Sequence, residues 1–390
     1  MRLPRRLGVL TLGHFTIDTY SSFFLPVLPL LFHRLGLNYT KVGALVAIAS
    51  LSSSFSQPLF GLLADRLRRP WFVAAGPVVA AVFMSAIGLA PTYWALVALL
   101  FLAGLGVAAF HPQTAALAGA SLKQRGVAMS FWVTGGTLGW ALGPLFATTT
   151  VGLFGIGRTW VAAIPGAAVS AVLFAWFARV PPAAHGSRPR TRLADLRPVA
   201  RPLTALYFAV VARSAVSIGF ATFLPLWAHA RGWSVAAGGT LTTVYLLLGA
   251  LGGFAGGWMA DRIGGRRVVI GSFLFAAPLY ALFFALPGRP ALALTCLVLG
   301  YFLLQGSLPV NVVLGQELSP VHAGTISSLL MGAAWGLGQL LIGPIGALAD
   351  HTSLATALLA LSGFVLLGFG CALHIPAGRR VPRAVPAPAD

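Results

Sequence analysis

The chain has 390 residues, of which 58% are hydrophobic and 8% are charged, and its formal net charge is +19. Soluble domains carry about 25% charged residues, so this chain has too little polar surface to cover a water-facing globule. The composition therefore excludes an ordinary soluble protein and predicts one that is embedded in a membrane.

Apolar runs follow one another along almost the whole chain, and each is long enough to cross a bilayer, which takes about 20 residues of helix. The runs lack the period-two alternation of membrane-barrel strands. The sequence therefore predicts an all-α polytopic membrane protein with twelve transmembrane helices. Their expected ranges are 7–32, 42–64, 71–90, 93–119, 127–154, 159–179, 202–229, 235–260, 267–287, 291–317, 323–349 and 353–375.

Basic residues gather on one side of the predicted membrane. If the N-terminus is cytoplasmic, 20 of the 26 Lys and Arg residues lie on that side, and the opposite side holds Arg34, Lys41, Arg158, Arg231 and Arg289. By the positive-inside rule, this bias predicts a bacterial-type inner (plasma) membrane protein with both termini in the cytoplasm. It also argues against a nucleic-acid patch, so no nucleic-acid partner is expected.

The two halves of the chain carry the same markers. The hexapeptide Gly-Leu-Leu-Ala-Asp-Arg at Gly61–Arg66 recurs as Gly-Trp-Met-Ala-Asp-Arg at Gly257–Arg262, an offset of 196 residues. Duplicated sets of apolar helices are typical of transporters. Three further pairs lie 197 to 200 residues apart: Pro26 with Pro225, Pro112 with Pro309, and Gly143-Pro144 with Gly343-Pro344.

These markers predict two pseudo-symmetric six-helix bundles related by an axis along the membrane normal. The expected regions are an N-terminal bundle at 1–180, a basic cytoplasmic linker at 181–201, a C-terminal bundle at 202–376 and a disordered cytoplasmic tail at 377–390. Proline, small residues and arginine dominate the linker and the tail, which carry no apolar run.

This arrangement resembles the major facilitator superfamily and, within it, the fosmidomycin-resistance (efflux) family. The turn after the eighth span matches the superfamily's loop motif in full, with Gly257, Asp261, Arg262, Gly264, Arg266 and Arg267. In the efflux family the residue after the His-Pro pair is commonly glutamate, whereas this chain has Gln113. The segments similar to that family are His14-x3-Asp18, Phe110-His111-Pro112, Gln316-Glu317-Leu318 and Gly346–Ser353.

The resemblance implies a secondary active transporter that works by alternating access and lines its central cavity with the first, fourth, seventh and tenth spans. The expected activity is proton-coupled efflux (antiport) of a small polar or anionic compound such as a fosmidomycin-like drug, by a monomer. An importer or uniporter of a small metabolite on the same fold is the alternative, and a non-transporting sensor or membrane enzyme is a remote one. The chain lacks a phosphate-binding loop and a Cys or His cluster with metal spacing. We therefore expect no cofactor and no metal, and a proton gradient as the energy source.

Ionisable residues inside spans are costly and are functional candidates by default. Asp18 is the predicted proton carrier, with the buried Arg213 as its expected counter-ion in the resting state. Glu317 is a second proton-coupling candidate, although a gate ion pair of Glu317 with Arg125 or a neighbouring basic residue is the favoured interpretation. Because Arg presents a bidentate fork, Arg213 suits a carboxylate or phosphonate. The predicted substrate-binding residues are His14, His111, Gln113, Arg213, Gln305 and Asn311, although structural helix-bridging roles are open for all of them.

Two further sets of residues have conformational roles in the prediction. Small residues allow helices to approach closely, and proline bends a helix end. The predicted gating residues are Asp65, Arg66, Asp261, Arg262, Arg266 and Asp350. The predicted helix-packing residues are Gly139, Gly143, Pro144, Gly343 and Pro344, with ordinary glycine packing as the alternative to a specific antiporter motif.

Overall fold

The computed structural model describes residues 5–67, 69–121, 125–177 and 193–376, and every regular element in these ranges is a helix. Twelve helical stretches are long and apolar enough to cross a membrane, which confirms the predicted fold class. Most of the predicted linker and the whole predicted tail lie outside the described residues. The division into four regions therefore stays a prediction.

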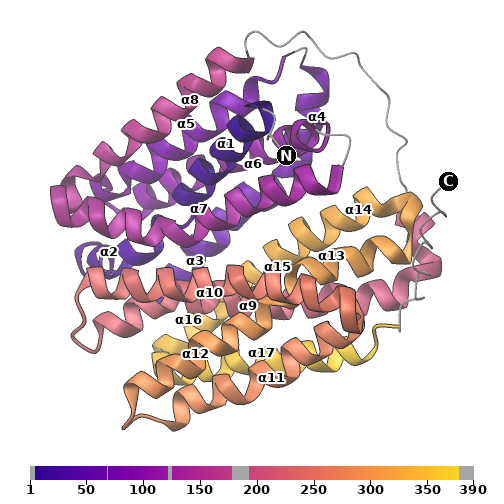
Figure 1. The fold of residues 1–390 in the computed structure, drawn as a ribbon. Helices are drawn as coiled ribbons and strands as arrows, with labels where there is room; N and C mark the ends of the chain where they lie inside the picture. The colour runs from indigo at the N-terminus through magenta and orange to yellow at the C-terminus, as the bar shows by residue number, and fades with distance from the viewer. Residues whose placement is uncertain (1–4, 68, 122–124, 178–192, 377–390) are drawn as a thin grey trace, which may run out of the picture.

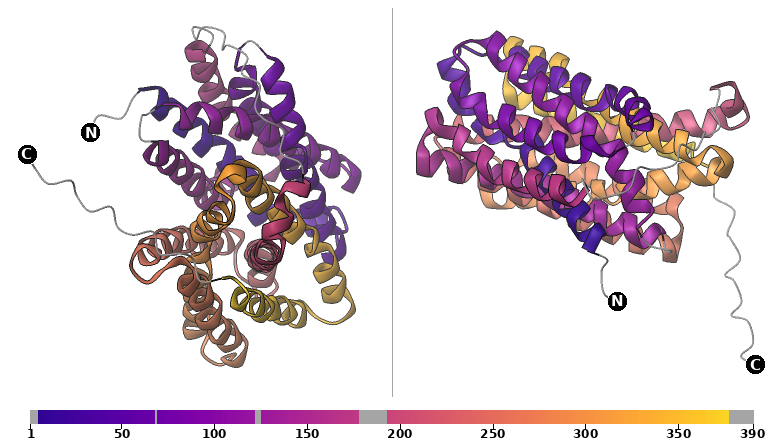
Figure 2. Two further views of the ribbon diagram at one scale, coloured as in Figure 1. Left: turned by 90° about the vertical axis from the view of Figure 1, so that its right-hand side faces the viewer. Right: turned by 90° about the horizontal axis from the view of Figure 1, so that it is seen from above.

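The helices form two groups that lie one above the other in Figure 1 and are also separate in the left-hand view of Figure 2. The first helix group contains α1 (Arg5–Ser21), η1 (Leu25–Val27), α2 (Leu28–Arg34), α3 (Tyr39–Ser50), η2 (Leu51–Phe55), α4 (Gln57–Arg66), α5 (Trp71–Ser85), η3 (Ala86–Leu89), α6 (Tyr93–Gly119), α7 (Arg125–Phe154), η4 (Ile156–Ala162) and α8 (Ala163–Phe177). Within it, α1 packs on α7, and α5 packs between α6 and α8.

The second helix group contains η5 (Leu193–Val199), α9 (Ala200–His229), α10 (Val235–Ile263), α11 (Gly265–Ala285), α12 (Pro290–Gln305), α13 (Ser307–Leu318), η6 (Pro320–His322), α14 (Ala323–Ser328), η7 (Leu329–Ala333), α15 (Ala334–Leu340), α16 (Ile342–His351) and α17 (Leu354–Leu373). In this group α9 packs on α17 and α15, and α12 packs between α10 and α11.

Prolines account for two of the breaks within spans, because proline has no N–H to donate to a helical carbonyl. The first span is split after Ser21, and Pro26 and Pro29 lie in the short helices η1 and α2 that follow. In the eleventh span, α15 ends at Leu340, four residues before Pro344. Pro112, by contrast, lies inside the continuous α6.

The two groups contact each other along two helix pairs, α3 with α16 and α7 with α10, and α2 also contacts α9. We call the end of the molecule formed by α2, the start of α3 and the end of α16 the far end; it lies on the left in Figure 1. At the opposite end, α4 packs on α6 and α14 on α13, each within its own group. The contacts between groups are thus concentrated away from α4 and α14.

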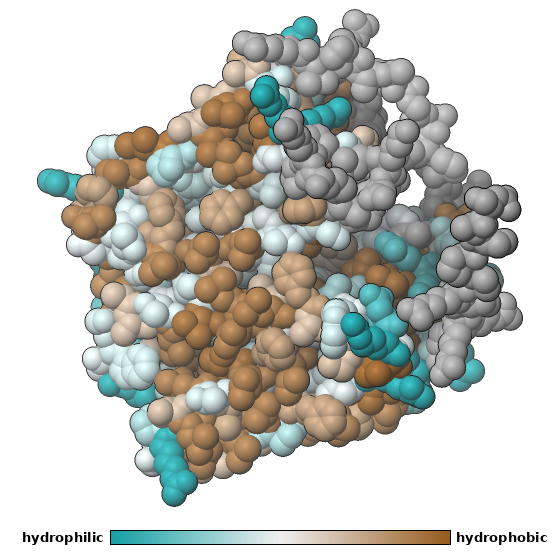
Figure 3. Space-filling model, viewed as in Figure 1, coloured by the Kyte–Doolittle hydropathy of each residue, from teal (hydrophilic) through white to brown (hydrophobic). Residues whose placement is uncertain are grey.

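The outer surface of the second group is largely apolar. Figure 3 shows hydrophobic residues across most of this face and hydrophilic ones near its edges. Phe275 and Leu366 are among its exposed large apolar side chains, and the first group exposes others, such as Trp94 and Leu153. Surface of this extent is unfavourable in water, and it matches helices that face lipid.

Candidate functional site

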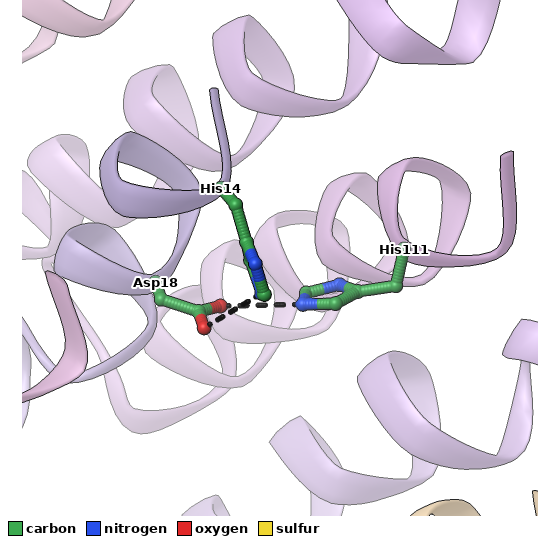
Figure 4. A group of neighbouring side chains, drawn as sticks. All are labelled: His14, Asp18 and His111. Carbon is green, nitrogen blue, oxygen red and sulfur yellow. Dashed lines mark ion pairs between the residues drawn. The ribbon is translucent and has the colours of Figure 1, made fainter. Parts of the chain in front are cut away.

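An aspartate and two histidines meet inside the first helix group. His14 and Asp18 are four residues apart on α1, so they lie on one helical face, and their Nε2 and Oδ2 atoms are 3.2 Å apart. His111 reaches the same carboxylate from α6, with Nε2 3.4 Å from Oδ1 (Figure 4). We call these three residues the His–Asp–His cluster.

Backbone carbonyls fix the tautomer of both imidazoles. The Nδ1 atom of His14 lies 2.7 Å from the carbonyl oxygen of Trp132, and that of His111 lies 2.8 Å from the carbonyl oxygen of Val107. A carbonyl oxygen only accepts hydrogen bonds, so each Nδ1 carries a proton and donates it. The Nε2 atom of each ring is therefore the one that faces Asp18.

The ring of His14 is also held from the side by α7. It stacks on the Trp132 ring with centres 3.8 Å apart. Gly136, one turn further along α7, lies against the cluster, and a Cβ atom there would collide with His14 Nε2 and Asp18 Oδ2. The position of His14 thus depends on an aromatic ring on one side and on the lack of a side chain on another.

Arg213 lies in the second helix group and is only 1% exposed. Its Nη1 donates to Gln305 Oε1 at 2.8 Å, and Gln305 Nε2 donates to the Tyr301 hydroxyl at 2.9 Å. Its Cζ lies 5.2 Å from the centre of the Trp335 ring, and its Nε is buried without a hydrogen-bond partner. Among the described side chains, no carboxylate forms an ion pair with it.

The predicted pair of Asp18 with Arg213 is therefore wrong. Both carboxylate oxygens of Asp18 face imidazoles of its own helix group, one from the same helix and one from α6. Arg213 instead uses a neutral amide of its own group. The physical reason is proximity: His14 is one helical turn from Asp18, whereas Arg213 is carried by a different bundle.

The other polar candidates have different surroundings. Gln113 accepts a hydrogen bond at 3.2 Å from the Val73 N–H in the first turn of α5, a donor that is shared with the Pro70 carbonyl at 3.1 Å. Asn311 is 1% exposed, and neither atom of its amide has a partner. Glu317 is exposed near the end of α13, and the side chain of Arg125 lies outside the described residues. The predicted pair between them stays a prediction.

Asp350 is the gating candidate that joins the two groups. Its carboxylate accepts hydrogen bonds from the backbone N–H of Tyr39 at 2.9 Å and of Thr40 at 2.8 Å. It also accepts one from the Thr40 hydroxyl at 2.6 Å. An anion at the first turn of α3 is favoured by the free N–H groups and the helix dipole.

The remaining gating candidates make local contacts or lie outside the description. Arg266 donates to the carbonyls of Ile375 and Leu373 at the end of α17, at 2.6 and 3.1 Å. Arg262 lies over the Trp258 ring on its own helix, and Asp261 is exposed. The side chains of Asp65 and Arg66 lie outside the described residues.

The predicted helix-packing residues divide into two kinds. A Cβ at Gly139 would collide with the Phe15 carbonyl, and one at Gly143 would collide with Ser22 and the Thr19 carbonyl, so both glycines let α7 approach α1 closely. A Cβ at Gly343 would meet nothing within 4 Å. The packing role predicted for Gly343 is therefore wrong, because the close approach there is set by Gly43, against which Ile342 and Gly343 lie.

The fold also brings together residues whose spacing in the sequence does not predict a shared site. The ligand atoms of His14, Asp18 and His111 lie within 4.8 Å of one another, although the sequence shows no metal-ligand spacing. Gly136, Tyr301 and Trp335 contact predicted site residues, and nothing in the sequence distinguishes them from other apolar-span residues.

The family model described as the Major Facilitator Superfamily matches residues 10–341 and 206–389 of the chain. The chain belongs to the major facilitator superfamily. It is therefore a multi-pass membrane transporter rather than an enzyme, and its partners include a small-molecule substrate and the lipid bilayer.

Two relatives of this superfamily transporter match over most of their length. An uncharacterized MFS-type transporter, YfnC of Bacillus subtilis (strain 168), is 30% identical over 374 residues, covering 93% of this chain and 90% of its own. The fosmidomycin resistance protein of Escherichia coli (strain K12) is 27% identical over 356 residues, covering 89% and 87%. The predicted resemblance to the fosmidomycin-resistance family is confirmed.

Solved structures share the transporter's fold. A bacterial homologue of the human lysosomal transporter Spinster, in an inward-facing and unoccupied conformation, has a TM-score of 0.79 at 17% identity and covers 95% of this chain and 97% of its own. The nucleoside transporter NupG has a TM-score of 0.74 at 17% identity, covering 96% and 99%. At such identities the likeness concerns the fold alone.

Proposed function

We propose that this transporter is a proton-coupled exporter (antiporter) of a small anionic compound, such as a fosmidomycin-like drug. It would work by alternating access as a monomer, in a bacterial plasma membrane with both termini in the cytoplasm. The observation that carries the anionic substrate is the buried guanidinium of Arg213, which has no described acidic partner.

A buried charge without a counter-ion is unfavourable, so a site that keeps one is suited to a ligand of opposite charge. Arg213 retains an unpaired Nε, and a guanidinium binds carboxylate or phosphonate oxygens in pairs. The Asn311 amide is a second buried polar group with free donors and acceptors in the same helix group. Together they support the recognition of an oxygen-rich anion in which Arg213 supplies the charge and Asn311 supplies neutral hydrogen bonds.

Proton coupling has a separate basis. Asp18 is a carboxylate inside a span, in contact with two imidazoles and away from Arg213. Glu317, exposed near the end of the tenth span, is the second carboxylate candidate. The proton-motive gradient is the proposed energy source, and the carboxylate of Asp18 the proposed carrier.

The names of several relatives favour export. Besides the fosmidomycin resistance protein, the multi-drug resistance efflux pump PmrA of Streptococcus pneumoniae is 27% identical over 157 residues, which is 38% of this chain. A probable 4-methylmuconolactone transporter of Cupriavidus pinatubonensis, 26% identical over 356 residues, favours the alternative of metabolite transport on the same fold.

The test uses purified protein in liposomes, with fosmidomycin as the first probe and 4-methylmuconolactone as the second. An antiporter accumulates the anion when the lumen is more acidic than the outside, whichever way the protein is inserted. A symporter requires the opposite gradient, and a uniporter responds to neither. Arg213→Gln should abolish accumulation, whereas Arg231→Gln, at an exposed arginine in a turn, should not. Transport that survives in Arg213→Gln contradicts the proposed anion site.

A further inference from the structure

We propose that His14, Asp18 and His111 form a binding site for one divalent transition-metal ion of the Zn²⁺ class. Two imidazole nitrogens and a carboxylate oxygen are ligands that such ions prefer. The three donors come from α1 and α6, and their ligand atoms lie within 4.8 Å of one another. The site requires no substrate, and an ion bound there would compete with the proton for the Asp18 carboxylate, the carrier in the proposed function.

The orientation of the two rings supplies the strongest support. Each Nδ1–H donates to a backbone carbonyl, of Trp132 or of Val107, which leaves the Nε2 atoms to face the carboxylate. In neutral imidazoles with a proton on Nδ1, each Nε2 carries a lone pair, and a lone pair directed at a carboxylate repels it unless a proton or a metal ion lies between them. Histidines that bind metals generally have this arrangement, with the second ring nitrogen fixed by a carbonyl or carboxylate.

The distances also agree with a metal centre. Tetrahedral ligands at metal distances of about 2.0–2.1 Å are separated from one another by about 3.3 Å. The contacts measure 3.2 Å from His14 Nε2 to Asp18 Oδ2 and 3.4 Å from His111 Nε2 to Asp18 Oδ1, each to a different oxygen of the carboxylate, and one ligand atom from each residue lies within 4.8 Å of the other two. Charge-assisted N–H···O bonds are shorter, at about 2.7–2.9 Å.

The His–Asp–His cluster is partly accessible to solvent, so an ion can reach it. The side chains of His14, Asp18 and His111 are 7%, 18% and 19% exposed, so a hydrated ion can approach through Asp18 and His111. The backbone of Gly136 packs closely against His14 Nε2 and Asp18 Oδ2, so access is from the side of His111 rather than from α7. Protein ligands fill three positions, and the fourth position of a tetrahedral ion is available to water or to an oxygen of an anion.

The charge of the site suits a divalent cation. One carboxylate and two neutral imidazoles leave a net charge of +1 when the ion binds. The described side chains that contact the cluster from α6 and α7 include Phe110 and Trp132, and both are apolar aromatic groups without charge. No described basic side chain forms an ion pair with Asp18 other than the two histidines, so the incoming cation meets no fixed competitor.

The experiment is a titration of the full-length protein in detergent, first freed of metal with a chelator. Co²⁺ binding is followed by the visible absorption of the four-coordinate ion, and Zn²⁺ is measured by competition and by thermal unfolding. We expect one ion per protein and a rise in the unfolding temperature with Zn²⁺, because a ligand that binds only the folded state stabilises it. Asp18→Asn and His111→Gln should each weaken binding at least about tenfold.

The matched control is His229→Gln. It alters a second pair of facing imidazoles, His33 and His229, whose ring centres are 5.8 Å apart, and it should leave the affinity unchanged. Equal affinity in the wild type, Asp18→Asn and His111→Gln would overturn the proposal, as would the lack of saturable binding to the wild type. If the variants fail to fold, X-ray absorption of the Zn²⁺-loaded wild type decides, because fewer than two imidazole ligands would contradict this site.

Discussion

Asp350 at the end of α16 caps the first turn of α3 in the other helix group by accepting hydrogen bonds from Tyr39 and Thr40. Among the described residues, Asp350 is a carboxylate of the second group that accepts hydrogen bonds from backbone N–H groups of the first group. In the proposed alternating-access cycle the two groups separate at the far end in one stage, so these bonds favour the conformation seen here.

Asp350→Asn should shift the conformational equilibrium toward opening of the far end. The loss of a charge-assisted acceptor and of a favourable interaction with the helix dipole corresponds to about 1–2 kcal/mol, or roughly 5- to 30-fold. The measurement is the rate at which a thiol reagent labels His229→Cys in a chain whose Cys296 and Cys371 are replaced by serine. His229 lines a cavity of about 220 Å³ between α2 and α9.

Asp261→Asn is the control for that experiment, because Asp261 is an exposed aspartate at the end of α10. Its labelling rate should equal that of the parent chain. A labelling rate in Asp350→Asn that is no faster than in Asp261→Asn would show that the bonds to Tyr39 and Thr40 do not hold the far end closed.

Arg213→Lys should keep the positive charge and still weaken the binding of an anion by about tenfold or more. An ammonium group cannot reproduce the planar fork that binds two oxygens, and it cannot keep the Gln305 bond in the same geometry. The measurement is the half-saturation concentration of substrate in liposomes, together with the unfolding temperature. Unchanged half-saturation in a folded variant would show that Arg213 contributes charge alone or does not contact substrate.

Gly139→Ala and Gly343→Ala form a matched pair that tests packing. The new methyl group at position 139 would collide with the Phe15 carbonyl of α1, whereas the one at position 343 meets nothing within 4 Å. Overpacking typically costs about 1–3 kcal/mol, so Gly139→Ala should lower the unfolding temperature in detergent and Gly343→Ala should not. Equal unfolding temperatures of the two variants would contradict the close contact of α7 with α1.

Arg266→Ala should destabilise the end of α17. The guanidinium satisfies two carbonyls, of Leu373 and Ile375, that have no helical donor, and loss of these bonds should cost about 1–2 kcal/mol. Hydrogen exchange at the last turn of α17 should become faster, while transport stays close to that of the parent. Arg267→Ala, at an exposed neighbour, is the control, and equal exchange in both variants would exclude a capping role for Arg266.

The sequence was sufficient for the fold because span length and hydropathy are local properties. Twelve spans follow from the apolar runs, and the contact of His14 with Asp18 follows from their spacing of four residues on α1. The addition of His111 to that pair depends on how α6 is rotated about its axis, which the repeat offsets do not reveal.

The same limitation explains the predictions that failed. The expected pair of Asp18 with Arg213 was based on charge alone, and charge does not indicate which residues the packing of two bundles brings together. Gly343 shares a Gly-Pro motif with Gly143, yet the two glycines face different surroundings, because Gly143 lies inside the continuous α7 whereas Gly343 lies at the start of α16, after α15 has ended.

The π-helical turns η2 and η7 have a mechanical consequence. Each inserts wider, less regularly bonded backbone into a long helix, and such turns bend more easily than the α-helix on either side. Because η2 and η7 contact each other, the second and eleventh spans have their most pliable turn at the same level. We therefore expect α4 and α14 to change their orientation by bending at η2 and η7, while α3 and α16 stay in contact.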